Sequence, residues 1–514
     1  NNVHLQKSKK IMIDTDLNVA KKLYPFQEKT VASIMEELEK NNEQHNILYQ
    51  LPTGGGKTVI FSELSKQYIE KTGKKVLVLT HRIELSVQTS QQLLARNVDS
   101  KIINSSVKTL DDQDDYKCFI AMVETLHNRL NEDNNFVKDV GLVIVDEAHY
   151  NSFRKLFQFY KHCNVLGVTA TPLSSNKALP LNDHYNNLLV GESITSLIEN
   201  NYLADGNTFS YDVNLQGLKI GTHGDFTVRS LDHVYGNNFM QEKLISAYDE
   251  IAKGQKTLIF NAGIETSLFV EETFKNLKYN VKHLDSTLGD KERKKIISWF
   301  RNTPDAILTS VGILTTGFDE PEVRNIILNR ATRSLTLYHQ MIGRGSRWMS
   351  NKKEFNIIDL GNNVRRFGLW QDYINWHDAF RFPDRFLESR ISEMEDLQFE
   401  VDYLFPKKYK EFFDTGKLES FSIADAYYHA LDNGIKGRIA IDQSMQNHFE
   451  VIKEASNDFL EAKGLINMLQ EHIEHRLKHY TKCITKSTPN YLKYLQETYN
   501  RKLSHKLRLA LDVD

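Results

Sequence analysis

The stretch Leu51-Pro52-Thr53-Gly54-Gly55-Gly56-Lys57-Thr58 is the most informative part of the sequence. It follows a short apolar run, Asn46–Gln50, and precedes a segment whose apolar side chains recur at helical spacing. Glycines between a strand and a helix let backbone N–H groups converge on phosphate oxygens. We therefore predict a phosphate-binding loop formed by Thr53 to Thr58, in which Lys57 reaches the β and γ phosphates and Thr58 holds Mg²⁺. The strict pattern has glycine where Leu51 stands, and a merely flexible turn is the alternative.

Two adjacent carboxylates follow a second apolar run. Asp146-Glu147-Ala148-His149 comes directly after Leu142–Val145. A phosphate loop needs a metal carboxylate on a neighbouring strand, so we predict that Asp146 holds Mg²⁺ and that Glu147 polarises the attacking water. An Asp-Glu pair on a solvated surface is the alternative interpretation.

Short apolar runs alternate with helical periodicity along most of the chain, which is typical of parallel-sheet α/β domains. The expected strands are Asn46–Gln50, Val76–Thr80, Cys118–Met122, Leu142–Val145, Val165–Thr169, Thr257–Asn261, Val281–Leu284, Ala306–Thr309, Asn325–Leu328 and Phe355–Asp359. Periodicity fails between about 203 and 239, which we interpret as a linker, and from about Gly368 the pattern is mostly helical. We predict two α/β domains, at 1–205 and 206–370, followed by a helical domain at 371–514.

The composition narrows the function classes. The 514 residues include 65 Lys and Arg against 67 Asp and Glu, so any nucleic acid must bind to a local basic surface. The apolar runs are too short to cross a membrane. The 3 cysteines are widely separated, which excludes a disulfide framework or four-cysteine zinc site and favours a reducing, cytoplasmic location.

Five ordered motifs resemble those of superfamily 2 helicases and translocases with two RecA-like motor domains. They are LPTGGGKT, DEAH, Val168-Thr169-Ala170-Thr171-Pro172, Leu314 to Asp319 and Tyr338 to Arg347. Further stretches resemble RadD-type DNA-repair helicases, namely Leu23 to Gln27, Gly224 to Phe226 and Asp359 to Gly368. The chain lacks the cysteine-rich zinc segment often found in RadD-type proteins.

The resemblance implies roles for further residues. Gln27 would read the adenine edge, although a structural helix cap is the alternative. Arg344 and Arg347, expected on one face of a helix, would act as arginine fingers toward the γ-phosphate. Gly317 and Asp319 would line the nucleotide.

Four side chains match positions that connect hydrolysis to domain motion in this family, and they are Thr169, Thr171, His149 and Gln340. His149 and Gln340 would form a polar bridge across the cleft. A threonine at a strand end often only satisfies backbone groups, which is the alternative for the two threonines.

Nucleic acid would lie across both motor domains and be held through its phosphates. The resemblance places Thr80, His81 and Arg82 in the first domain and Thr309 and Ser310 in the second at this surface. A second candidate surface is the segment 475–508, where nine Lys and Arg side chains and one acid are interleaved with tyrosines. A solvated helical face with tyrosines in the core is an equal alternative.

We predict an ATP- and Mg²⁺-dependent DNA helicase or translocase acting on single-stranded, forked or duplex DNA, with a possible protein partner at the helical domain and no membrane association. An RNA helicase and a motor subunit of a restriction or antiviral nuclease assembly are the alternatives. A non-catalytic ATP-binding scaffold would not need the full set of charged residues described above.

Overall fold

The computed structural model describes residues 22–40, 45–176, 178–213, 215, 217–221, 224–312, 314, 318–390, 400–401, 405, 407–433, 435–483 and 489–511. These residues form two compact units. The first lies within 1–211, 244–329 and 334–390, and the second within 212–243, 330–333 and 391–514. None of the helices in the described part of the chain combines the length and apolar character needed to span a bilayer.

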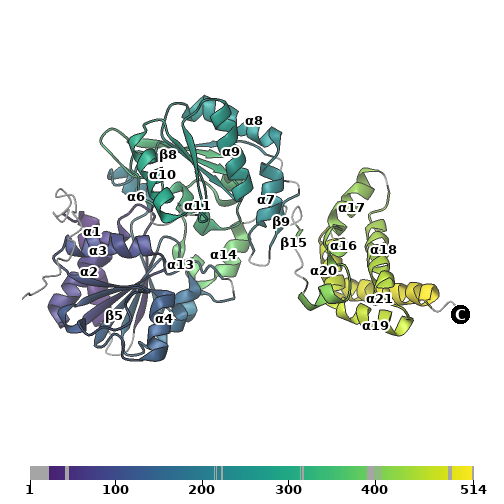
Figure 1. Ribbon diagram of the computed structural model, residues 1–514, viewed down its shortest axis with the longest axis horizontal. Coiled ribbons are helices and arrows are strands. Elements are labelled where there is room, and N and C mark those ends of the chain that lie inside the picture. Colours follow the sequence, from purple (N-terminus) through teal and green to yellow (C-terminus); the bar gives the residue numbers. More distant parts are fainter. Residues whose placement is uncertain are drawn as a thin grey trace, which may run out of the picture. The chain divides into compact units, whose positions relative to one another are not determined.

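The first unit contains a seven-stranded parallel sheet in the order β3-β4-β2-β5-β6-β1-β7. Figure 1 labels strand β5 of this sheet. Its strands are β1 (Asn46–Gln50), β2 (Lys75–Thr80), β3 (Ser100–Ile103), β4 (Cys118–Met122), β5 (Val140–Asp146), β6 (Asn164–Thr169) and β7 (Asn187–Val190). The helical segments with it are α1 (Pro25–Glu39), α2 (Lys57–Thr72), α3 (Ile83–Leu94), η1 (Gln113–Asp115), α4 (Val123–Glu132), η2 (Asn151–Phe153), α5 (Arg154–Phe157), η3 (Leu181–Asp183) and α6 (Ile194–Glu199).

Both faces of this sheet are buried, which explains the continuous apolar runs. Along β2, Val76 and Val78 join one core cluster, whereas Leu77 and Leu79 join the other. Helices α1 and α2 pack on the first face, and α4 packs on the second. Because successive side chains of a strand point to opposite faces, a strand covered on both sides must be apolar throughout.

A six-stranded parallel sheet in the order β11-β12-β10-β13-β14-β8 completes the first unit. Its strands are β8 (Asp205–Ser210), β10 (Thr257–Asn261), β11 (Val281–Leu284), β12 (Ile307–Val311), β13 (Asn325–Asn329) and β14 (Glu354–Asp359). The helical segments here are η4 (Tyr248–Ala252), α9 (Ile264–Asn276), α10 (Asp290–Asn302), α11 (Leu335–Ile342), α12 (Asn363–Phe367), α13 (Trp376–Arg381) and α14 (Pro383–Arg390). Trp376 and Phe380 of α13 return to pack on the core of the first sheet.

The interpretation of residues 203–239 as a linker is wrong in part. Strand β8 lies in this segment and pairs in parallel with β14 along its whole length. Its sequence, Asp-Gly-Asn-Thr-Phe-Ser, is polar because it is an edge strand with several exposed side chains. Backbone pairing alone therefore creates the strand, and no apolar periodicity marks it.

The second unit is mostly helical. It holds β9 (Lys219–Ile220) paired with β15 (Glu400–Val401), and α7 (Val228–Tyr235), while α8 (Asn238–Ala247) begins in it. Its remaining segments are η6 (Lys407–Glu411), α16 (Thr415–Glu419), α17 (Ile423–Asp432), α18 (Ile439–Glu454), α19 (Phe459–Met468), α20 (Gln470–Cys483) and α21 (Pro489–Leu511). The fold class predicted from the sequence, two RecA-like parallel-sheet domains and a helical C-terminal region, is confirmed. The exact domain boundaries stay a prediction.

A buried polar chain crosses the core of this helical region. His448 Nδ1 lies 2.6 Å from Tyr499 Oη, and His448 Nε2 lies 2.9 Å from His472 Nδ1. Burial, reinforced by the charge of Arg476, lowers the pKa of His448 well below its ordinary value and the pKa of His472 to about 2. Both imidazoles are therefore neutral in the folded chain at physiological pH.

This burial predicts loss of stability at acidic pH. As the pH falls through 6.5, the ordinary pKa of histidine, the unfolded chain binds protons that the folded chain does not bind. We expect the opening free energy of α18 and α20, measured by amide hydrogen exchange, to fall by about 1.4 kcal/mol per pH unit for each histidine. His448→Gln should remove about half of this slope. The exposed His429→Gln should keep it, and a flat wild-type profile would contradict neutral burial.

Candidate nucleotide site

The loop between β1 and α2 follows a path that glycine makes possible. Gly54 has φ +92° and Gly56 has φ +88°, in the left-handed region. A Cβ atom on Gly56 would also lie only 2.6 Å from Gln27 Nε2. Because side chains other than glycine are strained in this region, the triple glycine is a requirement of the loop's shape.

Gln27 connects this loop to the start of α1. Its Oε1 atom accepts a hydrogen bond from the Tyr24 N–H at 3.0 Å, and its Nε2 atom donates to the Gly55 carbonyl at 3.4 Å. The structural cap considered in the sequence analysis is therefore present. The contact with the loop also holds the Gln27 amide at the edge of the predicted nucleotide site, so adenine recognition stays a prediction.

Lys57, the first residue of α2, folds back over the loop. Its Nζ atom donates to the Leu51 carbonyl at 3.3 Å. Burial lowers the pKa of Lys57, although the charges of Glu147 and Asp146 act in the opposite direction. The two predicted acidic residues are thus close enough to interact with the ammonium group.

Asp146 ends β5, and Glu147 follows in a left-handed conformation with φ +54°. The Glu147 N–H donates to Asp146 Oδ1 at 3.0 Å. Burial, together with the charge of Glu147, raises the pKa of Asp146 to about 7. Burial also acts to raise the pKa of Glu147, but the positive charges of Lys57 and Arg344 outweigh it and lower that pKa. Glu147 is therefore the carboxylate that stays ionised, as a general base requires.

The donor atoms here fit Mg²⁺ bound together with a phosphate. Thr58 lies at the start of α2, and Glu147 Oε2 is buried with no hydrogen-bond partner among the residues that the structure describes. Among the described residues, no group of three or more His, Cys, Asp or Glu side chains is arranged to hold a metal by itself. Mg²⁺ in phosphoryl-transfer sites usually takes only one or two carboxylates and completes its shell with phosphate and water.

The expectation that Arg344 and Arg347 share a helical face is wrong. Helix α11 ends at Ile342, Arg344 lies in the following turn, and Arg347 forms an antiparallel bridge with Leu203. The reason is the close packing of Gly345, where a Cβ atom would lie 2.4 Å from the Phe355 ring. Close contact of this backbone with the sheet fixes the turn instead of a continued helix.

Both arginines nevertheless extend toward the nucleotide loop. Arg347 Nη1 donates to the Gly54 carbonyl at 2.9 Å, and its Nε donates to Asp319 Oδ1 at 2.8 Å. Arg344 Nη1 donates to the Phe318 carbonyl at 2.6 Å. Burial lowers the pKa of Arg344 to about 10, while the charge of Glu147 acts to raise it. Two guanidinium groups from the second sheet therefore lie beside the loop of the first.

One close approach between the two sheets' loops involves Gly343, which the sequence analysis did not single out. A Cβ atom on Gly343 would lie 2.5 Å from Thr53 Cβ. On the other side of the loop, a Cβ atom on Gly54 would lie 2.9 Å from Ser346 Oγ. The Gly-Arg-Gly sequence beginning at Gly343 is the only sequence signal, because the contact itself exists only after folding.

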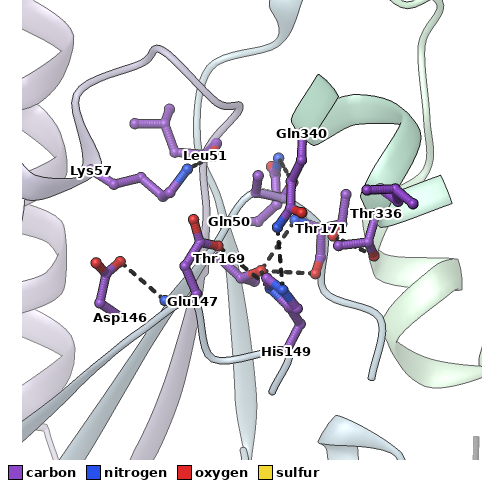
Figure 2. A network of polar contacts seen from close by, with 12 residues as sticks. Gln50, Leu51, Lys57, Asp146, Glu147, His149, Thr169, Thr171, Thr336 and Gln340 are labelled. Atoms are coloured by element: carbon purple, nitrogen blue, oxygen red, sulfur yellow. Dashed lines mark hydrogen bonds and ion pairs between the residues drawn. The ribbon is translucent and has the colours of Figure 1, made fainter. Parts of the chain in front are cut away.

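A polar network joins the first sheet to α11 (Figure 2). His149 Nδ1 lies 3.1 Å from Thr169 Oγ1, and its Nε2 lies 3.3 Å from Gln340 Nε2. Thr171 Oγ1 donates to Thr336 Oγ1 at 2.8 Å. The structure thus brings together all four predicted coupling residues and adds Thr336.

The donors and acceptors of this network fix the protonation of His149. An amide nitrogen only donates, so His149 Nε2 must accept from Gln340 and Nδ1 must carry the proton. Nδ1 then donates to Thr169 Oγ1, whose own hydroxyl donates to the Thr171 carbonyl at 2.9 Å. Burial lowers the pKa of His149, which agrees with a neutral ring.

The predicted nucleic-acid residues of the first sheet divide into two kinds. Thr80 is fully buried, and its Oγ1 lies 2.7 Å from Ser86 Oγ inside the fold. His81 and Arg82 are half-buried at the start of α3. Direct phosphate contact by the Thr80 hydroxyl is therefore incompatible with this structure.

The second-sheet residues are also buried. Thr309 Oγ1 accepts from Asn261 Nδ2 at 2.7 Å and lies 2.9 Å from Ser267 Oγ, and Ser310 is fully buried as well. These two hydroxyl groups belong to the core of the second sheet and do not face a groove. Gly317 lies outside the described residues.

The basic C-terminal segment is partly structural. Arg476 is buried and donates to the Leu418 carbonyl at 2.7 Å and to Asn447 Oδ1 at 2.8 Å. Tyr480 and Tyr499 are core residues, whereas Tyr494 is exposed. The alternative interpretation, with tyrosines in the core, holds for these two residues, and the basic surface is smaller than the sequence suggested.

Two domain families match the chain. Residues 20–174 match "Type III restriction enzyme, res subunit", and residues 240–349 match "Helicase conserved C-terminal domain". The matched ranges contain the nucleotide loop and the arginine turn, respectively.

Several curated proteins are similar in sequence. A "51.5 kDa protein" of a Lactococcus phage is 29% identical, covering 65% of this chain and 69% of its own. The "Putative ATP-dependent helicase IRC3" of Saccharomyces cerevisiae is 30% identical, covering 66% and 51%. The "Type I restriction enzyme EcoAI endonuclease subunit" of Escherichia coli is 24% identical, covering 64% and 45%. The chain thus spans about half the length of the last two relatives.

Solved structures share the fold. A fragment of a putative type I restriction HsdR subunit from Vibrio vulnificus has a TM-score of 0.53 at 21% identity, covering 70% of each chain. The type ISP restriction-modification enzyme LlaBIII has a TM-score of 0.51 at 13% identity, covering 96% of this chain and 43% of its own. The matched domains and the sequence relatives support a superfamily 2 helicase motor in this region, and the two solved structures show the shared fold.

Proposed function

We propose that this chain is an ATP-dependent DNA helicase or translocase, in which ATP hydrolysis drives movement on DNA or its unwinding. The observation that carries the proposal is the 2.9 Å hydrogen bond from Arg347 to the Gly54 carbonyl. This bond brings a cation of the second sheet to the phosphate loop of the first. A nucleotide bound at the loop would therefore contact both motor domains at once, which is what hydrolysis-driven motion requires.

The loop and its flanking residues would bind the nucleotide. Backbone N–H groups from Gly54 to Lys57 would face the phosphates, and Lys57 would leave the Leu51 carbonyl to contact them. Thr53, Gly317 and Asp319 would line the site, and Gln27 would read the adenine. Mg²⁺, when bound by Thr58 and Asp146, would offset phosphate charge.

Hydrolysis would use the ionised Glu147. Its lowered pKa keeps it able to accept a proton from the attacking water. Arg344 and Arg347 would stabilise charge that develops on the transferred phosphoryl group, since planar guanidinium groups match phosphate oxygens. The close contact of Thr53 with Gly343 would help to exclude water from the site.

The network around His149 would couple hydrolysis to motion. It links Glu147, whose Oε2 lies 3.5 Å from His149 Nδ1, to Gln340 on α11. The Thr171 to Thr336 bond adds a second connection. When phosphate leaves and the domains separate, both connections would break, so the state of the nucleotide is transmitted to the position of α11.

DNA is the preferred track because the first domain matches a restriction-enzyme family and one relative is a type I restriction subunit. His81 and Arg82 are the first-sheet residues we retain as nucleic-acid contacts. The narrower resemblance to RadD-type repair helicases, a role in DNA repair and a cytoplasmic location stay predictions.

Two alternative functions would use the same two motor domains. An RNA helicase would use the same phosphate-based contacts. A motor subunit of a restriction or antiviral nuclease assembly agrees with the restriction-enzyme relatives, and the helical region would then bind the protein partner.

The choice of nucleic acid is tested by ATP hydrolysis across a substrate panel. We expect single-stranded or forked DNA to raise turnover about tenfold or more, and RNA of the same sequence to raise it less. Duplex DNA should stimulate ATP turnover by a duplex translocase but not by an enzyme that tracks along one strand, so it distinguishes the two. Stronger stimulation by RNA than by every DNA would favour the RNA helicase. DNA cleavage seen only with an added partner would favour the nuclease assembly.

Lys57→Ala and Glu147→Gln separate binding from chemistry. Lys57→Ala should lose ATP binding and hydrolysis together, because the ammonium group contacts the phosphates. Glu147→Gln should keep nucleotide binding and lose turnover by about 10²–10⁴-fold, since the amide cannot accept the proton. Lys66→Ala on the same helix should resemble wild type. Wild-type turnover in either site variant would refute the site.

Gly343→Ala tests the close approach of the two domains. The added methyl group would overlap Thr53, so the loops cannot meet and stimulated turnover should fall about tenfold or more. Gly289→Ala is the matched control, because its Cβ would meet nothing within 4 Å. Thermal unfolding measured on both variants separates loss of domain closure from loss of fold. Equal turnover of Gly343→Ala and Gly289→Ala would contradict the closed contact.

A further inference from the structure

Three aromatic rings, each tilted against the next, form a continuous row that we call the ring stack, between the start of α3 and the His149 network. The ring centroids of His81 and Tyr150 are 4.4 Å apart, and those of Tyr150 and His149 are 4.3 Å apart. The interplanar angles are 43° and 40°. Aromatic rings in contact attract one another beyond simple burial of surface. Tyr150 therefore lies between the two histidines and contacts both of them.

One end of the stack acts on the catalytic carboxylate. His149 lies 3.5 Å from Glu147 Oε2 through Nδ1 and contacts Gln340 through Nε2. The backbone reinforces this link, because the Tyr150 N–H donates to the Glu147 carbonyl at 3.1 Å. Glu147 is held in a left-handed conformation, with φ +54°. A shift of Tyr150 would therefore move both a neighbour of the Glu147 carboxylate and the turn that fixes its backbone.

The other end of the stack is the His81 ring, whose two nitrogens lack hydrogen-bond partners in the described part of the chain. Both nitrogens are shielded from solvent. Leaving buried polar atoms without a partner costs about 1–3 kcal/mol. Burial lowers the pKa of His81 to about 4, so the ring is neutral where it lies. A phosphate oxygen within reach of the ring would accept a hydrogen bond from it and draw it away from this position.

We propose that Tyr150 is a positioning residue that transmits nucleic-acid binding at His81 to His149 and Glu147. The inference rests on the proposed function, because it assumes that nucleic acid contacts the chain beside α3. Phosphate contact moves the His81 ring, Tyr150 follows because the rings are in contact, and His149 then orients Glu147 for hydrolysis. The hydroxyl group of Tyr150 has no part in this, since the rings alone make the contacts.

The test compares Tyr150→Leu with Tyr150→Phe in the full chain. For each variant, ATP turnover is measured with and without a single-stranded DNA oligonucleotide, and DNA affinity is measured without ATP. We expect Tyr150→Leu to lower the ratio of stimulated to unstimulated turnover about tenfold, and Tyr150→Phe to keep it within about twofold. The concentration of DNA for half-maximal binding should stay within about twofold in both, because the tyrosine does not contact the strand.

Two further variants keep the test decisive. Tyr116→Leu removes a half-buried ring from the same domain outside the stack and should keep the wild-type ratio. The effects of His81→Leu and Tyr150→Leu on the ratio should not add in a double-mutant cycle, since either breaks the same stack. A wild-type ratio in Tyr150→Leu, equal losses in Tyr150→Phe and Tyr150→Leu, or full additivity would overturn the inference. If no nucleic acid stimulates the wild-type chain, the proposed function fails first.

Discussion

The site depends on one hydrogen bond, from Arg347 Nη1 to the Gly54 carbonyl. It connects the turn that follows α11 to the glycine loop that precedes α2, so in the proposed function neither sheet would carry a complete nucleotide site by itself. Asp319 holds the same guanidinium group through Nε, which fixes the direction in which the arginine extends. A permanently charged, planar group suits this place, because it can contact the loop before ATP binds and a phosphate afterwards.

The close contact needs small residues on both sides. Gly343 approaches Thr53, and Gly54 approaches Ser346, at distances that leave no room for a Cβ atom. Around this contact, the network of His149, Thr171 and their partners on α11 makes a second connection between the sheets. The buried carboxylates lie between these two sets of contacts. Interfaces packed this tightly tend to have discrete open and closed arrangements, and such behaviour is what a motor requires.

Much of this fold could be predicted from the sequence, because strands buried on both faces must be apolar throughout. Strands β1, β4 and β10 begin and end where the apolar runs do. Strand β8 could not be found this way, since it is a polar edge held by backbone pairing.

In the site, spacing alone located the glycine loop and the carboxylates. It misplaced Arg344 and Arg347 on a helix, because the packing of Gly345 against Phe355 is a tertiary constraint. The hydroxyl groups of Thr80, Thr309 and Ser310 are likewise buried by the packing of neighbouring side chains. Such packing exists only in the folded chain, so the sequence pattern could not reveal it.

The most direct test of a nucleotide site shared between the two motor domains is the turnover of Arg347→Ala at saturating ATP and nucleic acid. We expect a loss of about 10³-fold or more with ATP affinity retained within a few fold, because an arginine finger acts mainly on the transition state. Arg347→Lys should recover little of this, since a single ammonium group cannot contact Asp319 and the loop together. Turnover of Arg347→Ala within a few fold of wild type would contradict the shared site.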